Sequence, residues 1–296
     1  MRSLHLCLTL LALTTASPAT AQLQLPGAVG AGGGGGGSPD REAAPAAGVA
    51  VRAPAESTIL GRELRLNGAR GRLSFEKRGA DLVVTRLTLS GEKISRHGDA
   101  CSVDVTEGPF TAVPKGRAEG LRRYEVTIPS CTFTMEVLDG AVQAHVGEAS
   151  ASSPLAGYCE FKQADCKGFM AGVWGPAASS LGPNEIKAIE RSRSVAEKNA
   201  RANYRALLAA AGRDRDKVRL VASEQAGFSS SRSERCYEYQ GEDKHGFCSS
   251  RITEAWAIAL RARLNPDAFL KEDDAKPAAR RPPRRTTPPP APAPLQ

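Results

Sequence analysis

The sequence lacks any apolar run long enough to cross a membrane, because a membrane helix needs about 18 such residues. Its most apolar stretch, Leu4–Leu13, is shorter and lies close to the N-terminus. Arg2 precedes this stretch and Ala19-Thr20-Ala21 follows it, an arrangement typical of a cleaved export signal. We therefore expect residues 1–21 to be a signal peptide and the mature protein to be periplasmic or secreted, with no membrane span.

The sequence also lacks the patterns of common catalytic and cofactor sites. Only His97, His145 and His245 follow the export segment, and none stands in a zinc-protease frame. The glycine run Gly32–Gly37 is not followed by the Lys-Ser or Lys-Thr of a phosphate-binding loop. No two carboxylates are marked by their spacing as a catalytic acid and base. We therefore expect a protein that is not an enzyme and that has no cofactor and no metal.

Cysteine is scarce, but its spacing is regular. Cys7 lies inside the export signal, and the other six cysteines form three near-neighbour pairs: Cys101 with Cys131, Cys159 with Cys166, and Cys236 with Cys248. Exported thiols are usually oxidised, so we expect three disulfides, with sequential pairing as the simplest arrangement. A rival interpretation is a zinc site formed by Cys236, His245 and Cys248, although structural zinc normally takes four ligands at tighter spacing.

Composition divides the N-terminal half into a tether and a β segment. Residues 22–56 are rich in glycine, alanine and proline, which indicates a flexible tether. Residues 57–148 contain short alternating runs, such as Asp81–Leu89 and Tyr124–Ile128, that are bounded by turn formers. This alternation predicts an antiparallel β domain with one buried face, as in a sandwich, a roll or a small partly open barrel.

Residues 149–182 show neither the two-residue alternation of strands nor the period of about 3.6 residues that is typical of helices. They contain the close pair Cys159 and Cys166. A disulfide across so short a loop would stabilise an irregular connector by about 2 kcal/mol. Trp174 stands between glycines in this segment. Two interpretations are open for its side chain: it packs the connector onto a neighbouring domain, or it faces a ligand.

Residues 183–264 change to a helical period and predict three helices. The first ends at Gly212, the second begins at Asp214, and the third has Ser250 as its N-cap and ends before Pro266. We expect four large side chains to face inward: Tyr204, Leu208, Phe228 and Trp256. The zones together predict an α+β fold, in which an antiparallel β domain precedes a disulfide-tied three-helix domain, with disordered termini.

Basic charge is concentrated near the C-terminus. Residues 183–264 contain 16 Lys or Arg against 11 Asp or Glu, whereas residues 57–182 contain 15 against 14. Residues 265–296 are basic and proline-rich, so we expect a disordered tail. The basic half favours anionic envelope polymers or lipid head groups over nucleic acid, since no basic and aromatic strip is present. The alternative is that these charges only solvate exposed helix faces.

Between residues 199 and 264, tyrosine, leucine, glutamine, arginine and cysteine residues occur at characteristic spacings. Its members are Asn203-Tyr204, Leu207-Leu208, Leu220, Glu224-Gln225, Phe228, Arg232, Cys236, Cys248, Thr253-Glu254 and Leu260. This pattern resembles the LprI-like family of exported, lysozyme-inhibitor-like bacterial proteins. That family has a Tyr-x-x-Leu helix, a Gln-x-x-Trp-x-x-x-Arg-x-x-x-Cys helix, and a closing Cys followed by Thr-x-x-Arg-x-x-x-Leu. Arg201, Phe228 and Trp256 depart from the family's Asn, Trp and Arg.

The resemblance implies a protein that binds and blocks a lysozyme or a related lytic enzyme. Such an inhibitor fills the substrate cleft and offers donors to the two catalytic carboxylates. Three basic residues near the disulfide loop are candidates for this role: Arg232, Arg235 and Lys244. A basic domain would approach a basic host lysozyme slowly, so an acidic or neutral lytic enzyme fits better. The alternative function is that of a structural or anionic-polymer-binding envelope protein without inhibitory activity. The alternative role of the arginines is only to cover the exposed face of the second helix.

Overall fold

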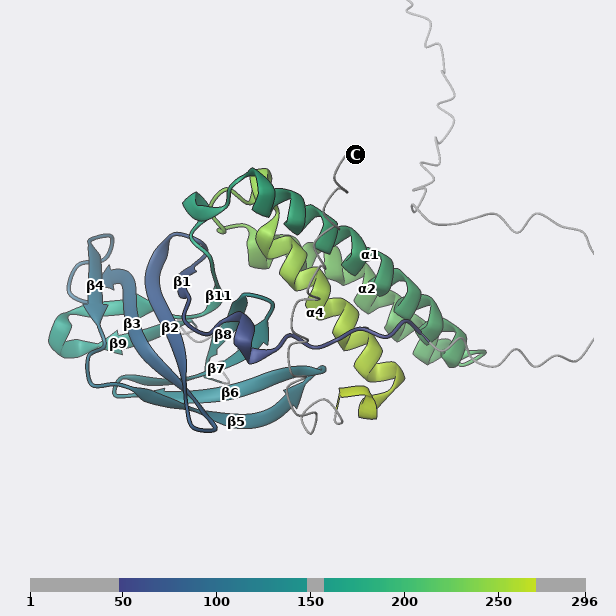
Figure 1. Ribbon diagram of the computed structural model, residues 1–296, viewed down its shortest axis with the longest axis horizontal. Coiled ribbons are helices and arrows are strands. Elements are labelled where there is room, and N and C mark those ends of the chain that lie inside the picture. The colour runs from purple at the N-terminus through teal and green to yellow at the C-terminus, as the bar shows by residue number, and fades with distance from the viewer. Residues whose placement is uncertain (1–47, 148–156, 270–296) are drawn as a thin grey trace, which may run out of the picture. The chain divides into compact units, whose positions relative to one another are not determined.

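The computed structural model describes residues 48–147 and 157–269, and these form an α+β fold in which a large antiparallel sheet precedes the helices (Figure 1). The strands are β1 (Glu63–Leu66), β2 (Arg70–Arg78), β3 (Asp81–Lys93), β4 (Ala100–Asp104), β5 (Phe110–Ala118), β6 (Leu121–Ile128), β7 (Cys131–Leu138), β8 (Ala141–Val146), β9 (Tyr158–Phe161), β10 (Cys166–Phe169) and β11 (Gly172–Gly175). The predicted antiparallel β segment is therefore confirmed. The predicted signal peptide, most of the predicted tether and nearly all of the predicted C-terminal tail lie outside the described residues.

The sheet closes on itself, because β2 pairs with both β1 and β3. The closed path runs β2–β1–β11–β8–β7–β6–β5–β3 and returns to β2. The long strand β3 has two further neighbours near its end, β4 and β10, and β9 pairs with β10. Alternate residues of each strand consequently face the inside of the closed sheet.

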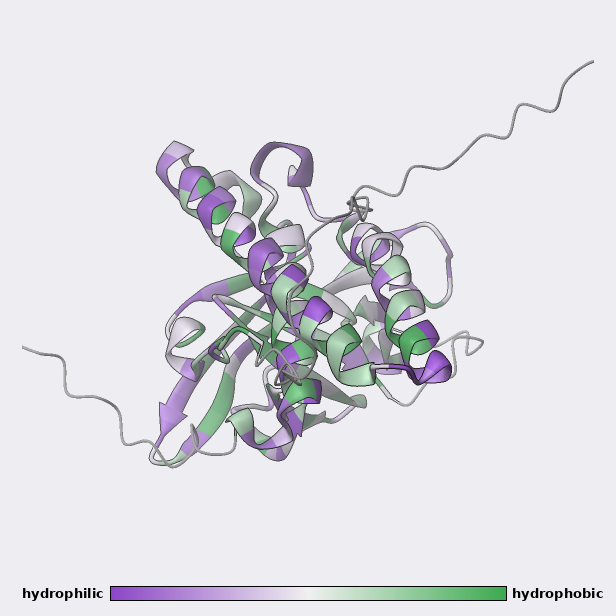
Figure 2. Ribbon diagram, turned by 90° about the vertical axis from the view of Figure 1, so that its right-hand side faces the viewer, coloured by the Kyte–Doolittle hydropathy of each residue, from purple (hydrophilic) through white to green (hydrophobic). Residues whose placement is uncertain are grey.

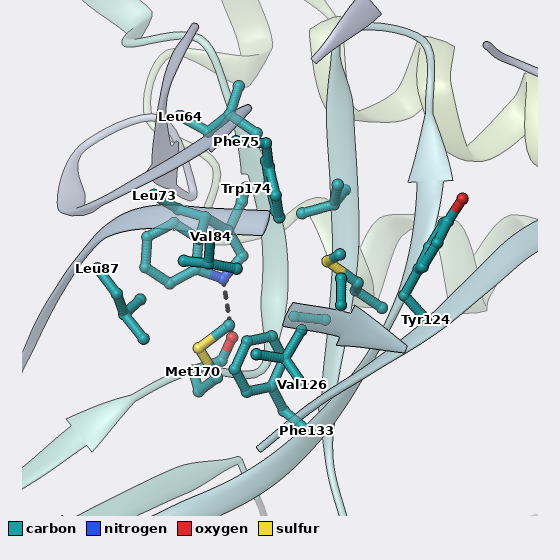
Figure 3. Packing of buried hydrophobic residues seen from close by; sticks show 14 of the residues in the cluster. Leu64, Leu73, Phe75, Val84, Leu87, Tyr124, Val126, Phe133, Met170 and Trp174 are labelled. Atoms are coloured by element: carbon teal, nitrogen blue, oxygen red, sulfur yellow. Dashed lines mark hydrogen bonds between the residues drawn. The ribbon is translucent and has the colours of Figure 1, made fainter. Parts of the chain in front are cut away.

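The inside of the closed sheet is filled by apolar side chains (Figure 3). Tyr124, Val126 and Phe133 point inward from β6 and β7, as the two-residue period requires. Trp174 on β11 is fully buried among them, and its Nε1 donates a hydrogen bond to the carbonyl of Met170 at 2.9 Å. Trp174 is thus a core residue and does not face a ligand. A buried tryptophan normally needs such an acceptor for its N–H.

The segment that we expected to be a connector is part of the sheet. Strand β11 lies between β1 and β8 and completes the closed path. Strands β9 and β10 form a hairpin that pairs with the end of β3. These strands are only four residues long, which is too short for their alternation to stand out in the sequence.

Two of the three predicted disulfide pairings are wrong. The cysteines of the hairpin bond to the rest of the sheet and not to each other: Cys101 pairs with Cys166, and Cys131 pairs with Cys159. The sequential pairing failed because β-sheet neighbours need not be neighbours in the sequence. Gly91 of β3 marks how closely the hairpin approaches, since a Cβ there would lie 1.7 Å from the carbonyl oxygen of Lys167.

Four α-helices occur in the described part of the chain, so the predicted count of three is not confirmed. They are α1 (Pro183–Ala211), α2 (Arg215–Cys236), the one-turn α3 (Glu242–His245) and α4 (Phe247–Leu264). Asp214 caps α2 as expected, because its carboxylate accepts the N–H groups of Asp216 and Lys217. Ser250, by contrast, lies inside α4, whose N-cap is Gly246, four residues earlier than predicted.

Helices α1, α2 and α4 lie beside one another, and their mixed polar and apolar residues are visible in Figure 2. The outer face of β6, β7, β8 and β11 contributes Leu121, Leu138, Ala141 and Val173 to one apolar cluster. The helices contribute Ile189, Ile252 and Ile258 to the same cluster. The β segment and the helices therefore share a core. No helix in this described part is both long enough and apolar enough to span a membrane.

The helix contacts are closer than the large residues alone suggested. Tyr204, Leu208, Phe228 and Trp256 are half-buried and not fully inward-facing. The buried positions on α1 and α4 include five alanines: Ala196, Ala200, Ala206, Ala257 and Ala259. Alanines at such positions let the helices pack without large side chains between them.

The folded part extends beyond both predicted boundaries. Residues 48–55, which we expected in the flexible tether, contact the helices: Val49 N–H donates to the buried Asn203 Oδ1 at 2.7 Å. The expected disordered tail begins with a short 3-10 helix, Pro266–Phe269, whose Phe269 is buried beside Ile258 and Gly120. Single anchoring residues of this kind leave no periodic signal in a sequence.

Candidate interaction surface

The disulfide between Cys236 and Cys248 closes the loop of residues 237–247 between α2 and α4, as predicted. We refer to these residues as the disulfide loop. Both sulfurs are used in this bond, so the zinc alternative is excluded. The ring nitrogens of His245 instead face the carbonyl of Gln240 at 2.8 Å and the N–H of Phe247 at 3.1 Å.

The disulfide loop is fixed onto two parts of the sheet, the residue that follows β11 and the turn between β1 and β2. The hydroxyl of the buried Tyr239 donates to the carbonyl of Pro176 at 2.9 Å. Burial raises the pKa of Tyr239, so its hydroxyl stays protonated and keeps this hydrogen bond. The exposed Glu238 accepts hydrogen bonds from Arg70 Nη2 at 2.6 Å and from Asn67 Nδ2 at 3.2 Å. These contacts hold the loop from two sides.

The helical turn α3 supplies a further anchor for the disulfide loop. Glu242 accepts the N–H groups of Cys248 and Ser249 at 3.0 and 2.7 Å. A carboxylate at this position satisfies N–H groups that α4 leaves free and is favoured by the helix dipole. The loop is therefore ordered before any partner arrives, which lowers the entropic cost of binding.

Two side chains extend from this rigid loop. Tyr237 is 88% exposed, the largest exposure among the large apolar residues that the structure describes. Lys244 is exposed on α3, next to the equally exposed Asp243. Glu238 is paired with Arg70, whereas Glu242 accepts hydrogen bonds only from neutral N–H groups and keeps its charge, so the loop carries Glu242 and Asp243 against Lys244. An exposed tyrosine on a preorganised loop is typical of a protein-binding element.

A groove of about 630 Å³ lies beside this loop, between α2, α4 and the outer face of β6–β8. One face of α2 lines it at helical spacing, from Glu224 through Phe228 to Arg235. The sheet contributes three charged or titratable residues: Arg123, Glu136 and His145. We call this hollow the helix–sheet groove.

Glu136 is the buried centre of the sheet side of the helix–sheet groove. Its Oε1 accepts from Arg123 Nε at 2.7 Å and its Oε2 lies 2.9 Å from His145 Nε2. Burial alone would raise the pKa of the Glu136 carboxyl, but the hydrogen bonds and charges of His145 and Arg123 outweigh burial and lower this pKa. A carboxylate that stays ionised with both oxygens occupied is a poor proton acceptor near neutral pH. The cluster is therefore suited to orienting Arg123 and His145 toward the groove.

The opposite side of the helix–sheet groove carries an aromatic stack. Phe228 of α2 and Trp256 of α4 have ring centroids 5.0 Å apart and planes inclined by 11°. Trp256 Nε1 donates to Gln225 Oε1 at 3.1 Å, which fixes the indole. Two of the three residues that depart from the LprI-like pattern thus contact each other. Both rings are half-buried, so they combine helix packing with an apolar surface in the groove.

The structure separates the three basic residues singled out in the sequence. Arg232 is held inside the helices, because it donates to Thr253 Oγ1 at 3.1 Å and lies over the Phe228 ring at 5.4 Å. Arg235 is exposed at the rim of the helix–sheet groove. Lys244 lies on the disulfide loop and does not line that groove. Only Arg235 and Lys244 are therefore open to a partner.

Sequence reasoning missed Tyr237 and the cluster around Glu136. A signal for the cluster was present, because the two-residue turn Asp139-Gly140 fixes the register of β7 against β8. That register places Glu136 opposite Gln143 and therefore on the same face as His145. The exposure of Tyr237 had no such signal, since it depends on contacts that hold the loop to a distant turn.

The chain was compared with protein-family models, curated proteins and solved structures, and no match was found.

Proposed function

We propose that the protein is an exported, non-catalytic binding protein of the cell envelope that blocks a lysozyme or a related lytic enzyme through its disulfide loop. The observation that carries this proposal is the rigid loop from which Tyr237 and Lys244 extend. Three disulfides are compatible with an extracytoplasmic location. The export signal in residues 1–21 supports the same location.

The chemistry of a glycosidase cleft suits the disulfide loop. The cleft carries two carboxylates that act on the sugar bond. The Lys244 ammonium and the Tyr237 hydroxyl are donors that such carboxylates can accept. A loop that is already ordered can enter a cleft without paying a further ordering cost. With Glu242 and Asp243 against Lys244, the loop itself is slightly acidic and does not repel a basic enzyme.

The experiment is an inhibition assay with a panel of basic, neutral and acidic lysozymes acting on peptidoglycan. Tyr237→Ala and Lys244→Ala should each weaken inhibition about tenfold or more, since hot-spot residues contribute about 2 kcal/mol or more. Lys217→Ala is the matched control, because Lys217 is exposed near the start of α2, at the opposite end of this helix from the loop and about 30 Å away at about 1.5 Å per residue. No inhibition of any enzyme, or inhibition that ignores both loop variants, would contradict the proposal.

The helix–sheet groove provides a second contact for the same partner. Arg235 lies at its rim and directly precedes the disulfide at Cys236. Arg235→Ala should therefore weaken inhibition, whereas Arg232→Ala should lower stability instead, because Arg232 is bonded to Thr253 within the helices. Melting curves of both variants separate these two effects.

The second candidate function is binding of an anionic polymer. The basic tail that favours it lies almost entirely outside the described residues. The described part offers a separate observation in its support, an arginine-rich face on the sheet.

A further inference from the structure

The outer face of β1–β4 carries an unusual concentration of arginine and hydroxyl side chains. Cross-strand register places Arg72 beside Thr88, Thr88 beside Asp104, and Ser90 beside Ser102. Residues that are paired in register across antiparallel strands point to the same side of a sheet. We call this surface the arginine face; its arginines are Arg65, Arg72, Arg78 and Arg86.

The arginine face is hollowed. Two depressions of about 400 and 330 Å³ share Arg72, Thr88 and Asp104 in their linings and therefore lie next to each other. The larger depression opens where β3 passes from β5 to β4, because Leu82–Val84 pair with β5 and Thr88–Glu92 pair with β4. The surface is thus an extended groove and not a flat patch.

The charge of this groove is only partly neutralised. Arg65 is engaged by Glu63 at 2.7 Å and by the carbonyl of Gly71 at 3.0 Å. The guanidinium groups of Arg72 and Arg86 lie 3.9 and 3.7 Å from the carboxylate of Glu63, and their side chains are 47% and 58% exposed. Arg78 is exposed and has no ion pair within the described part of the chain. Three guanidinium groups consequently keep donors for a ligand.

Acceptors and hydroxyls are interleaved with these arginines. Asp104 accepts a hydrogen bond from Thr88 Oγ1 and lines both depressions. Ser90 and Ser102 line the smaller depression, and Phe110 with Pro109 provides an apolar part of the larger one. A guanidinium group binds a carboxylate or a sulfate through two parallel hydrogen bonds. Asp104 and the hydroxyl side chains can instead form hydrogen bonds with uncharged hydroxyl groups.

We propose that the arginine face binds an acidic glycan, a sugar chain that carries carboxylate or sulfate groups. Sugar hydroxyls satisfy Asp104 and the serines, the apolar side of a sugar ring covers Phe110, and the anionic groups pair with Arg72, Arg78 and Arg86. A polyphosphate chain fits less well, because it has no hydroxyl groups along the chain to donate to Asp104 or to pair with the serines. This site is separate from the disulfide loop and does not depend on lysozyme inhibition.

The test measures binding of the full mature chain to heparin and to polygalacturonate at 0.1 M salt. The triple variant R72A/R78A/R86A should bind both glycans at least tenfold more weakly. The matched control R201A/R205A/R213A removes the same charge from exposed positions on α1 and the α1–α2 turn, and should change binding less than threefold. Melting curves verify that each variant is folded. Equal losses in the two triple variants would mean non-specific attraction and would overturn the proposal.

Asp104→Ala provides the sharper measurement, because simple electrostatics and the proposal predict opposite results. Removing a negative charge strengthens non-specific attraction of any polyanion. If Asp104 accepts hydrogen bonds from sugar hydroxyls, the variant should bind polygalacturonate several-fold more weakly and polyphosphate more tightly. Tighter binding of the glycan to this variant, or polyphosphate binding that exceeds glycan binding in the wild-type chain, would overturn the assignment to a glycan.

Discussion

The disulfides of the β9–β10 hairpin provide a quantitative prediction about stability. Replacing Cys101 and Cys166 by serine opens a link between residues 65 apart in the sequence, and replacing Cys131 and Cys159 opens a link between residues 28 apart. In the chain-entropy model these links contribute about 4 and about 3.5 kcal/mol. The Cys236–Cys248 link, with a separation of 12, contributes about 3 kcal/mol.

The assay is equilibrium urea unfolding of the three double variants in parallel. With a urea dependence of about 2 to 3 kcal/mol per molar, each variant should lower the unfolding midpoint by about 1 to 2 M. The loss should follow loop length, with the pair Cys101 and Cys166 the most costly. Peptide mapping of the oxidised wild-type chain should find Cys101 joined to Cys166. A peptide that joins Cys101 to Cys131, or a reversed order of stability losses, would refute the reasoning.

Three further predictions concern the core and the groove. Phe269→Ala should lower the free energy of unfolding by about 3 to 5 kcal/mol in urea unfolding, because a buried aromatic ring is removed; an unchanged midpoint would place this ring in solvent. An isolated fragment of residues 183–264 should lack a cooperative thermal transition by circular dichroism, because its apolar face loses the sheet residues of the shared cluster; a sharp transition would mean that the helices fold alone. The lowered pKa of Glu136 means that its stabilising effect is present at neutral pH and is lost as the pH falls through the folded-state pKa, below about 4.5. Glu136→Gln should therefore flatten the dependence of unfolding midpoint on pH in that acidic range, and an unaltered dependence would contradict the ion-pair cluster.

The sequence was informative where a local pattern determines the structure. The two-residue period of the β segment and the caps at Gly212 and Asp214 predicted element type and several boundaries correctly. The Cys236–Cys248 pair was also predicted, because its two cysteines flank one short loop. Each of these features depends on residues within about a dozen positions of one another.

The sequence was uninformative where contacts between distant segments decide the outcome. Cys101 bonds to Cys166 only because β4 and β10 both pair with the end of β3. Phe269 is ordered only because the sheet and α4 provide a place for its ring. The same reasoning applies to Tyr237, whose exposure depends on anchors from the β1–β2 turn. A single sequence contains no local signal for such contacts.

Hydrogen exchange tests most directly whether the disulfide loop is the element that binds a lytic enzyme. The mature chain is mixed with each lysozyme that it inhibits, and amide exchange is measured with and without the enzyme. Exchange should become slower in residues 237–247 and should not change in β3 and β4. The absence of any complex, or protection confined to segments other than the disulfide loop, would contradict this role of the loop.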